Sequence, residues 1–191
     1  MAKTERAHVE MESAAELRAW LAAQPQDAAS VWLVHYKKHV PDRCVTFGEI
    51  VRACLSYGWI DSQVKGVDAD RVKRLISPRR PGSIWSAVNK RHVAELEASG
   101  EMTDAGRAAI TRAQADGSWV FLDEIDALVV PPDLQAAMDA EIAVAESWVG
   151  YPRGEKKQSL YHLKSAKRPA TRARRLATVV ANARLGRRTF T

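Results

Sequence analysis

Residues whose side chains could bind a charged ligand crowd into one stretch of the sequence, residues 57–93. The stretch combines aromatic, acidic and basic side chains at spacings typical of turns. Arg79 and Arg80 stand between two prolines, shortly before a segment expected to begin a helix. Guanidinium groups beside the positive N-terminal end of a helix suit a carboxylate or a phosphate. The sequence therefore predicts an anion-binding site at this turn.

We predict that this site is a pocket with aromatic walls. Trp59 and Trp85 would supply the walls, because pockets for small ligands are usually lined by apolar and aromatic side chains. The alternative is that the two arginines are solvated or bound to a structural carboxylate, for which Asp61 is available. The predicted ligand-binding residues are Tyr57, Trp59, Asp61, Arg79, Arg80, Ser83, Trp85 and Asn89.

Asp61 is the residue of this set that could act as a general acid or base. It follows Trp59 by two residues, so in a strand both side chains point to one face. An apolar neighbour there raises the pKa of a carboxyl group, and an arginine lowers it. No nucleophile motif, metal-ligand cluster or cofactor loop accompanies Asp61 in the sequence. An enzyme using Asp61 with Arg79 and Arg80 is therefore an alternative, and we expect a protein without catalysis, metal or cofactor.

The composition is that of an ordinary soluble protein. The 191 residues are 46% hydrophobic, which is enough for a sizeable core. The first 20 residues lack the apolar region of a secretory signal, and no run approaches the roughly 18 apolar residues of a membrane span. The two cysteines, Cys44 and Cys54, do not suggest a disulfide framework or a zinc site. We expect a cytoplasmic protein that does not insert into membranes.

The net charge of +6 hides an uneven distribution along the chain. Residues 153–191 hold 12 Lys and Arg against one Glu, which leaves 17 basic and 22 acidic residues for residues 1–152. Residues 116–152 contain eight acidic residues and no Lys or Arg. This asymmetry favours an anionic partner for the basic part, or docking of the basic part on the acidic part of the same molecule.

Nucleic-acid binding by the basic part is a second candidate function. Its basic side chains cluster within about three helical turns and could neutralise several phosphates. Basic helices are commonly solvated faces, however, and the acidic segment offers a counter-surface within the chain. The residues of this alternative are Lys164, Lys167, Arg168, Arg172, Arg174 and Arg175.

The hydrophobic pattern predicts an α+β fold, with a small antiparallel sheet packed with helices in the N-terminal half and a mainly helical C-terminal half. Strands are expected at residues 30–36, 60–67 and 71–77. Capping motifs predict helices that begin at Ser13, Thr46 and Thr103. Gly58 stands where the second of these helices should end in a left-handed residue.

The remaining helices follow from apolar periodicity. One should begin at Trp85, one should run from Asp133 towards Trp148, and two more should span residues 155–166 and 169–185. In the first, a buried stripe is expected from Trp85, Val88, His92 and Leu96. We predict a single domain, residues 1–191, in which residues 1–11 are disordered, residues 12–100 form the α+β part, and residues 101–191 form the helical part with a basic C-terminal helix pair.

Motifs along most of the chain carry a resemblance to a known family. They are GWID at 58–61, PRRPGSIWS at 78–86, Asn89, Gly100 with Met102, and AKRPATRARR at 166–175. Together they resemble the YdeI/OmpD-associated family, also described as bacteriocin-protection proteins. Ser62 stands where the resemblance implies a glycine.

The resemblance implies a role in tolerance of bacteriocins or cationic peptides and carries no settled enzymatic activity. It also implies an outer-membrane porin as a partner, which a chain without an export signal is not expected to meet directly. Our leading interpretation is a cytoplasmic, non-catalytic protein that binds a small anionic ligand or an acidic protein partner within residues 57–93.

Overall fold

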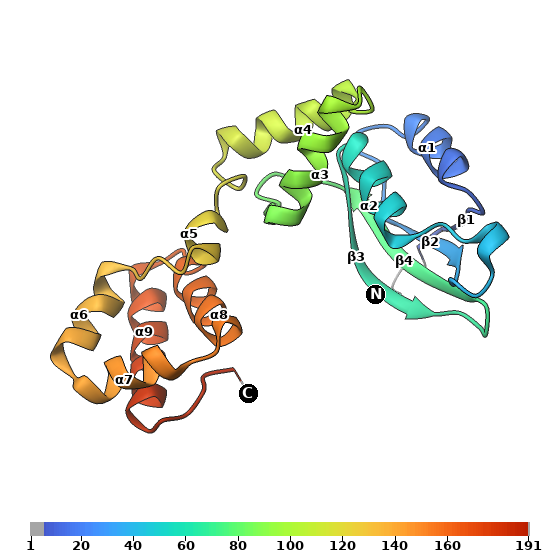
Figure 1. The fold of residues 1–191 in the computed structure, drawn as a ribbon. Helices are drawn as coiled ribbons and strands as arrows, with labels where there is room; N and C mark the ends of the chain where they lie inside the picture. The colour runs from blue at the N-terminus through green and yellow to red at the C-terminus, as the bar shows by residue number, and fades with distance from the viewer. Residues whose placement is uncertain (1–5, 191) are drawn as a thin grey trace, which may run out of the picture. The chain divides into compact units, whose positions relative to one another are not determined.

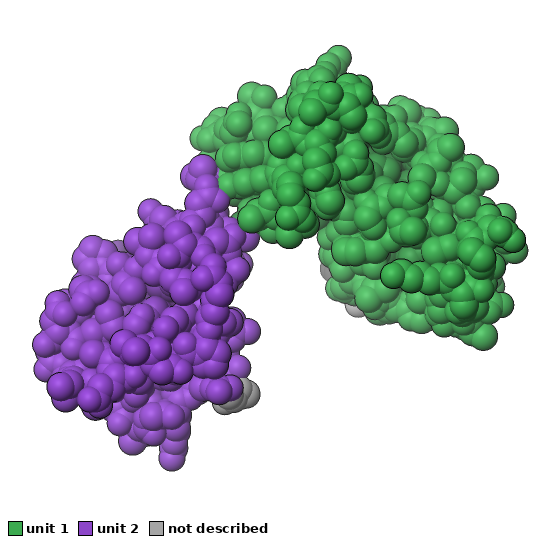
Figure 2. Space-filling model, in the orientation of Figure 1, with its two compact units in different colours: residues 1–119 green, residues 120–191 purple. Residues whose placement is uncertain are grey.

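A computed structural model describes residues 6–190 and divides into two compact units, unit 1 up to Trp119 and unit 2 from Val120 onward (Figure 2). The sequence placed the change from α+β to helical structure at residue 100, within a single domain. In the structure the helix that follows residue 103 belongs to unit 1, because its apolar residues pack with those of the preceding helices. The predicted α+β class is confirmed.

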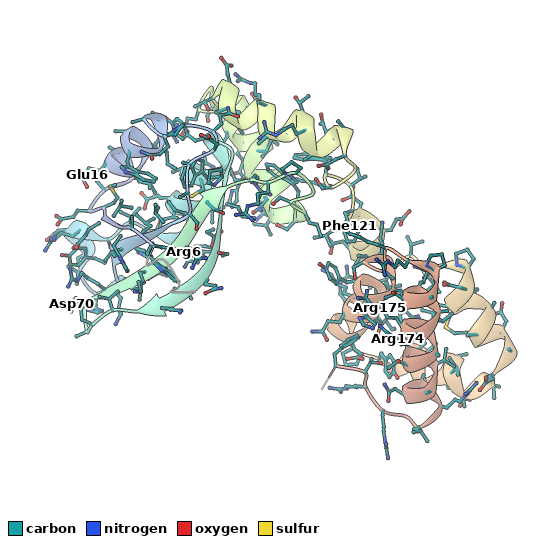
Figure 3. All side chains as sticks on the ribbon, turned by 180° about the vertical axis from the view of Figure 1, so that it is seen from behind. Arg6, Glu16, Asp70, Phe121, Arg174 and Arg175 are labelled. Atoms are coloured by element: carbon teal, nitrogen blue, oxygen red, sulfur yellow. The ribbon has the colours of Figure 1, made fainter. Side chains whose placement is uncertain are left out.

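Unit 1 contains a four-stranded sheet in the order β1-β2-β4-β3 (Figure 1). β3 and β4 form an antiparallel hairpin, whose tip is marked by Asp70 in Figure 3, and β2 pairs antiparallel with β4. β2 is internal, and all six of its residues are buried, as its apolar sequence indicated. The bounds are β1 His8–Glu10, β2 Val31–Tyr36, β3 Trp59–Gly66 and β4 Arg71–Pro78.

The predicted disorder of residues 1–11 is wrong where the structure can test it, and residues 1–5 lie outside the described part. Residues 8–10 form β1, which pairs parallel with β2 and makes the sheet mixed instead of purely antiparallel. β1 forms because of its contacts with distant parts of the chain. β2 would otherwise leave a row of backbone groups unpaired at its edge, and Val9 and Met11 add apolar contacts to the core.

Four helices complete unit 1, and each begins at the residue type that satisfies free backbone N–H groups. Thr46 and Glu49 make the predicted capping box. At Ser13 the helix also begins as predicted, but the Glu16 carboxylate accepts from the N–H of Glu12 instead of Ser13. The helices are α1 Ala14–Ala22, α2 Phe47–Ser56, α3 Ala87–Ala98 and α4 Asp104–Ala115, with a short 3-10 turn at Pro41–Arg43.

The buried stripe predicted for α3 is only partly correct. The helix begins at Ala87 after its cap Ser86, so Trp85 precedes it and does not follow the helical period. Val93 and Leu96 define the buried face, whereas Val88 is 50% exposed. Leu96 thus belongs to both the predicted and the observed buried face, and Trp85 is buried although it lies before the helix.

α2 is shared by two apolar clusters of unit 1. On one side Ile50 and Cys54 belong to a cluster that also contains Trp59 and residues of α1 and the sheet. Figure 1 shows α1, α2 and the sheet of this unit. On the other side Val51 and Leu55 pack with Trp85, α3 and α4. The four residues lie on adjacent sides of α2, and all of them are buried.

Unit 2 is a helical bundle around a core that contains Trp148, Leu163 and Val179. The single helix predicted from Asp133 is two helices, because Glu141 is extended (φ −142°) and pairs with Arg184. The last two helices lie close to their predicted spans. The helices are α5 Asp123–Asp126, α6 Pro132–Ala140, α7 Ile142–Gly150, α8 Arg153–Lys164 and α9 Pro169–Arg184.

Within residues 6–190, none of the helices has the length and the apolar character needed to span a membrane.

The first prediction concerns Gly58, which has φ +74° as expected and a backbone neighbour as well. A Cβ built on Gly58 would lie 2.8 Å from the carbonyl oxygen of Ala105. Gly58→Ala should therefore lower the free energy of unfolding by at least about 2 kcal/mol, through left-handed strain and the clash. Gly82→Ala is the matched control, because Gly82 has the same φ but open space around it, and it should cost about 1–2 kcal/mol. Equal losses in urea titrations would mean that the contact with α4 contributes nothing.

The second prediction concerns Arg172 in unit 2. Its guanidinium donates to both oxygens of Asp133 at 2.7 and 2.8 Å and to the carbonyl of Leu163 at 3.1 Å. Arg172→Ala should lower the free energy of unfolding by about 1–2 kcal/mol, because a partly buried carboxylate is left unpaired. Arg174→Ala should leave the free energy of unfolding nearly unchanged, since Arg174 is exposed and makes no side-chain ion pair within the described chain. Hydrogen exchange across α9 distinguishes the two, and equal protection in both variants would contradict this role.

Candidate functional site

Arg79 leaves the end of β4 and turns into the interior of unit 1. Its backbone N–H donates to the carbonyl of Gly58 at 2.9 Å, which ties the turn to the end of α2. The turn closes through Gly82, whose N–H donates to a carboxylate oxygen of Asp116 at 2.7 Å. The guanidinium stacks on Trp85, with its central carbon 3.6 Å from the ring centroid. Arg79 is consequently only 5% exposed. It is therefore not solvated, as the alternative interpretation of the sequence had allowed.

The buried guanidinium of Arg79 is only partly satisfied. Nη1 donates to the hydroxyl of Ser83 at 3.3 Å and to the carbonyl of Ile84 at 3.4 Å. Nε and Nη2 are buried and have no hydrogen-bond partner among the described residues. Burial lowers the pKa of Arg79 to about 10, so the group keeps its charge at neutral pH. These two N–H groups form the parallel fork that binds a carboxylate or phosphate edge-on.

Three cavities surround the segment of residues 78–81, and we call them together the cleft. The largest, about 340 Å³, lies against residues 26–30 and is lined by Arg79 and Arg80. The smallest, about 10 Å³, is lined by the same two arginines together with Arg112 of α4. A third, about 60 Å³, is also lined by Arg112 and lies beside α1 and the end of α2. Three positive side chains therefore face one cleft.

The structure brings together most, but not all, of the predicted site residues. Tyr57 and Trp59 line the 60 Å³ cavity, whereas Ser83 and Trp85 line the 10 Å³ cavity. The two tryptophans belong to different apolar clusters, so they do not face each other as the two walls of one pocket. Asn89 lines none of the three cavities, and its N–H donates to the cap Ser86.

Asp61 is engaged by an arginine other than the two expected from the sequence. Its carboxylate accepts from Arg74 at 2.9 Å, and both side chains are largely buried. Arg74 lies on β4 beside β3, so the pairing follows from strand register and not from the Arg79 turn. The Arg74 guanidinium also lies over the ring of Phe47 at 4.3 Å. Asp61 lines none of the three cavities, and an enzymatic role of Asp61 with Arg79 and Arg80 gains no support from this placement.

Ser62 follows Asp61 at a β-bulge. The pairing of β3 with β4 shifts register between Asp61 and Val64. The Ser62 hydroxyl donates to the carbonyl of Leu75 across the hairpin at 3.4 Å. The position at which the family resemblance implied a glycine is therefore an irregular strand and not a turn.

Arg112 in the cleft and His35 in the sheet had no recognisable signal in the sequence. Arg112 reaches the cleft only because α4 packs on α2, and nothing near it in the sequence marks it. His35 lies within the apolar run of β2, where it is 6% exposed and neither ring nitrogen has a partner in the described chain. Burial also raises the pKa of the Cys54 thiol, which keeps it protonated.

Within residues 6–190, no three His, Cys, Asp or Glu side chains gather as a metal site would require. His39, which has helical spacing from His35 in the sequence, instead pairs with Asp70 at 2.9 Å.

The basic residues of the nucleic-acid alternative divide into two groups. Lys164 pairs with Glu124 at 2.7 Å, and Arg175 donates to the carbonyl of His162 at 2.6 Å, in addition to the Arg172 pair. Lys167, Arg168 and Arg174 are exposed and make no side-chain ion pair in the described chain. Figure 3 shows Arg174 and Arg175 on α9. Half of the predicted cluster is thus held by unit 2 itself.

A third prediction follows from His35. Burial, together with the positive charge of Arg74, lowers the pKa of His35 below its ordinary value near 6.5. Between the folded and unfolded pKa values, the unfolded chain binds more protons, so the free energy of unfolding falls as the pH falls below about 6.5. His35→Phe should remove this contribution and flatten the difference in stability between pH 7.5 and pH 5. Urea titrations at both pH values measure it, and an unchanged difference would show that His35 is not buried in its neutral form.

Two family models match the chain, one within each compact unit. Residues 9–109 match a Domain of unknown function (DUF8412), and residues 127–186 match the family described as Bacteriocin-protection, YdeI or OmpD-Associated. The second match contains the motif at 166–175 and confirms the resemblance. The motifs at 58–61 and 78–86 fall in the first match instead.

Comparison with curated proteins and with solved structures gives no significant match. The family assignment therefore depends on the two matched segments, of which the first covers more than half of the chain. Through residues 9–109 the chain belongs to the family of the Domain of unknown function (DUF8412), and at residues 127–186 it carries a Bacteriocin-protection, YdeI or OmpD-Associated domain.

Proposed function

We propose that unit 1 binds a small anion in the cleft, through Arg79, Arg80 and Arg112. The observation that carries the proposal is the buried Arg79 fork, whose Nε and Nη2 have no acceptor among the described residues. A buried donor without a partner costs about 1–3 kcal/mol, and more when it is charged. An anionic oxygen that reaches this fork would recover that free energy on binding.

The three arginines have different parts in this proposal. Arg79 is held in one orientation by its stack on Trp85, so little side-chain entropy is lost when an anion binds. Arg80 and Arg112 are exposed and make no ion pair in the described chain, which leaves their donors free to attract an anion. The 10 Å³ cavity has room for about one oxygen atom, so the rest of an anion would lie outward, beside Arg80.

Two acidic residues line the cleft as well. The carboxylate of Asp116 already accepts from the N–H groups of Gly82 and Ser118. Asp27 lines the 340 Å³ cavity. Three guanidinium groups against two carboxylates leave a positive balance, which supports an anionic ligand over a cationic one.

The biological setting is also part of the proposal. The family name of residues 127–186 refers to bacteriocin protection, and we place this chain in the same context, as a cytoplasmic protein that contributes to tolerance of bacteriocins or cationic peptides. In this view the anion is a ligand that the protein senses or carries. Nucleic-acid binding by α8 and α9 is less well supported, because Lys164, Arg172 and Arg175 already donate within unit 2.

The fourth prediction tests anion binding. Phosphate or sulfate should raise the melting temperature of unit 1 above the value in sodium chloride of equal ionic strength, because a ligand that binds only the native state stabilises it. Arg80→Ala and Arg112→Ala should each weaken the phosphate affinity by about 5- to 10-fold, the loss of one charged hydrogen bond. Arg79→Lys keeps the charge but removes the fork, and it should weaken binding at least as much.

Arg91→Ala is the matched control, since Arg91 is an exposed arginine of α3 that lines none of the three cavities. It should leave the response to phosphate unchanged. Equal stabilisation by phosphate in the wild type and in the Arg80 and Arg112 variants would exclude the cleft as the anion site.

A further inference from the structure

The three cavities of the cleft share their lining residues. Gln26 and Pro78 line both the 60 and the 340 Å³ cavities, and Arg112 lines both the 60 and the 10 Å³ cavities. Arg79 and Arg80 line both the 10 and the 340 Å³ cavities. Residues 78–81 therefore border adjacent cavities, of which two are lined by Arg79 and Arg80 and the third lies on the other side of Arg112 and Pro78.

The third, the 60 Å³ cavity, differs in chemistry from the two that Arg79 and Arg80 line. Leu21 and Trp59, which line it, belong to the adjoining apolar cluster. Tyr57, Pro78 and Ala105 add further apolar surface, Gln24 and Gln26 contribute polar surface, and Arg112 is the one charged residue of its lining. An apolar group placed here would lie next to a guanidinium that can hold its anionic end.

The walls of the 60 Å³ cavity are fixed relative to one another. Gly58 approaches the backbone of Ala105 so closely that a Cβ would lie 2.8 Å from the carbonyl oxygen. The Thr103 hydroxyl donates to the carbonyl of Ser56 at 2.6 Å, which ties the start of α4 to the end of α2. The cavity is therefore formed in the structure before any ligand binds, as is usual for small-molecule sites.

We infer that the ligand is an organic anion, a carboxylate or phosphate monoester with a short apolar body, and not an inorganic ion. The inference depends on the proposed function, because the anionic group uses the same arginines. The anionic end lies between Arg79, Arg80 and Arg112, and the apolar body enters the 60 Å³ cavity past Arg112. Since one water-sized group needs about 10–15 Å³, the body has about four to six non-hydrogen atoms.

The experiment compares inorganic phosphate with methyl, ethyl, butyl and octyl phosphate, and acetate with pentanoate, by calorimetry at constant ionic strength. Affinity should rise by about two- to fourfold for each added methylene up to butyl, as apolar surface is buried. It should then level off at octyl, because the cavity is filled. Parallel gains for pentanoate over acetate would show that the apolar body, and not the phosphoryl group, is recognised.

Ala22→Leu fills the cavity without altering the core, because Ala22 is an exposed residue that lines it. This variant should lose at least about 5-fold in butyl phosphate affinity and keep the affinity for inorganic phosphate. Ala19→Leu is the matched control on the same helix, since Ala19 is exposed and lines none of the three cavities. It should bind both ligands as the wild type does.

The outcomes separate this inference from the proposed function. Phosphate binding without any gain from methyl to butyl, or an Ala22→Leu variant that keeps the gain, overturns the organic ligand and leaves the anion site in place. Binding of neither inorganic nor organic anions overturns both. A gain that disappears in Ala22→Leu and persists in Ala19→Leu supports the inference.

Discussion

The contact between the end of α2 and the start of α4 is the constraint on which unit 1 depends. Gly106 faces the carbonyl oxygens of Ser56 and Leu55 so closely that a built Cβ would lie 2.4 and 2.9 Å from them, and Gly58 makes the reciprocal approach to α4. Such close approach of two backbones is possible only at glycine. Because α4 is fixed in this way, Arg112 reaches the turn that carries Arg79 and Arg80. The cleft is thus a consequence of helix packing and not of the turn alone.

Burial of the Arg79 guanidinium without acceptors for Nε and Nη2 costs free energy, which other contacts must offset. Arg79 loses hydration when it stacks on Trp85, and it regains only the two long hydrogen bonds of Nη1. Cation–π attraction of a desolvated guanidinium offsets part of this cost, by about 2 kcal/mol. The aromatic pair of Trp85 and Trp119, with centroids 5.0 Å apart, holds the ring in place. The rest of the cost is not offset within the described chain, because Nε and Nη2 have no acceptor there.

The sequence predicted those features that depend on neighbouring residues. Thr46 and Thr103 identified helix starts because capping is a contact over three residues, and Gly58 identified a left-handed helix end for the same reason. Contacts between distant segments were not predictable in this way. Asp61 pairs with Arg74 through strand register, and β1 forms because β2 offers a free edge, so neither has a local signal. The position of Arg112 in the cleft likewise depends on the packing of α4, so a prediction from neighbouring residues named the turn of residues 78–81 and omitted Arg112.

The distribution of charge in unit 2 has a consequence for function. Several acidic residues before Arg153, namely Glu124, Asp126, Asp133 and Glu141, pair with basic residues after it. Most of these pairs are partly exposed, so each contributes modestly, but together they direct much of the basic excess inward. The exposed basic residues without an ion pair in the described chain still include Lys167, Arg168, Arg174, Arg187 and Arg188. The net charge counted along a stretch of sequence therefore overstates the charge that the folded surface presents to a partner. The same count does not identify Arg80 and Arg112, the arginines of the cleft that have no ion pair in the described chain. The proposed anion site accordingly uses guanidinium groups that the fold leaves without a carboxylate, those of Arg79, Arg80 and Arg112 around the turn of residues 78–81.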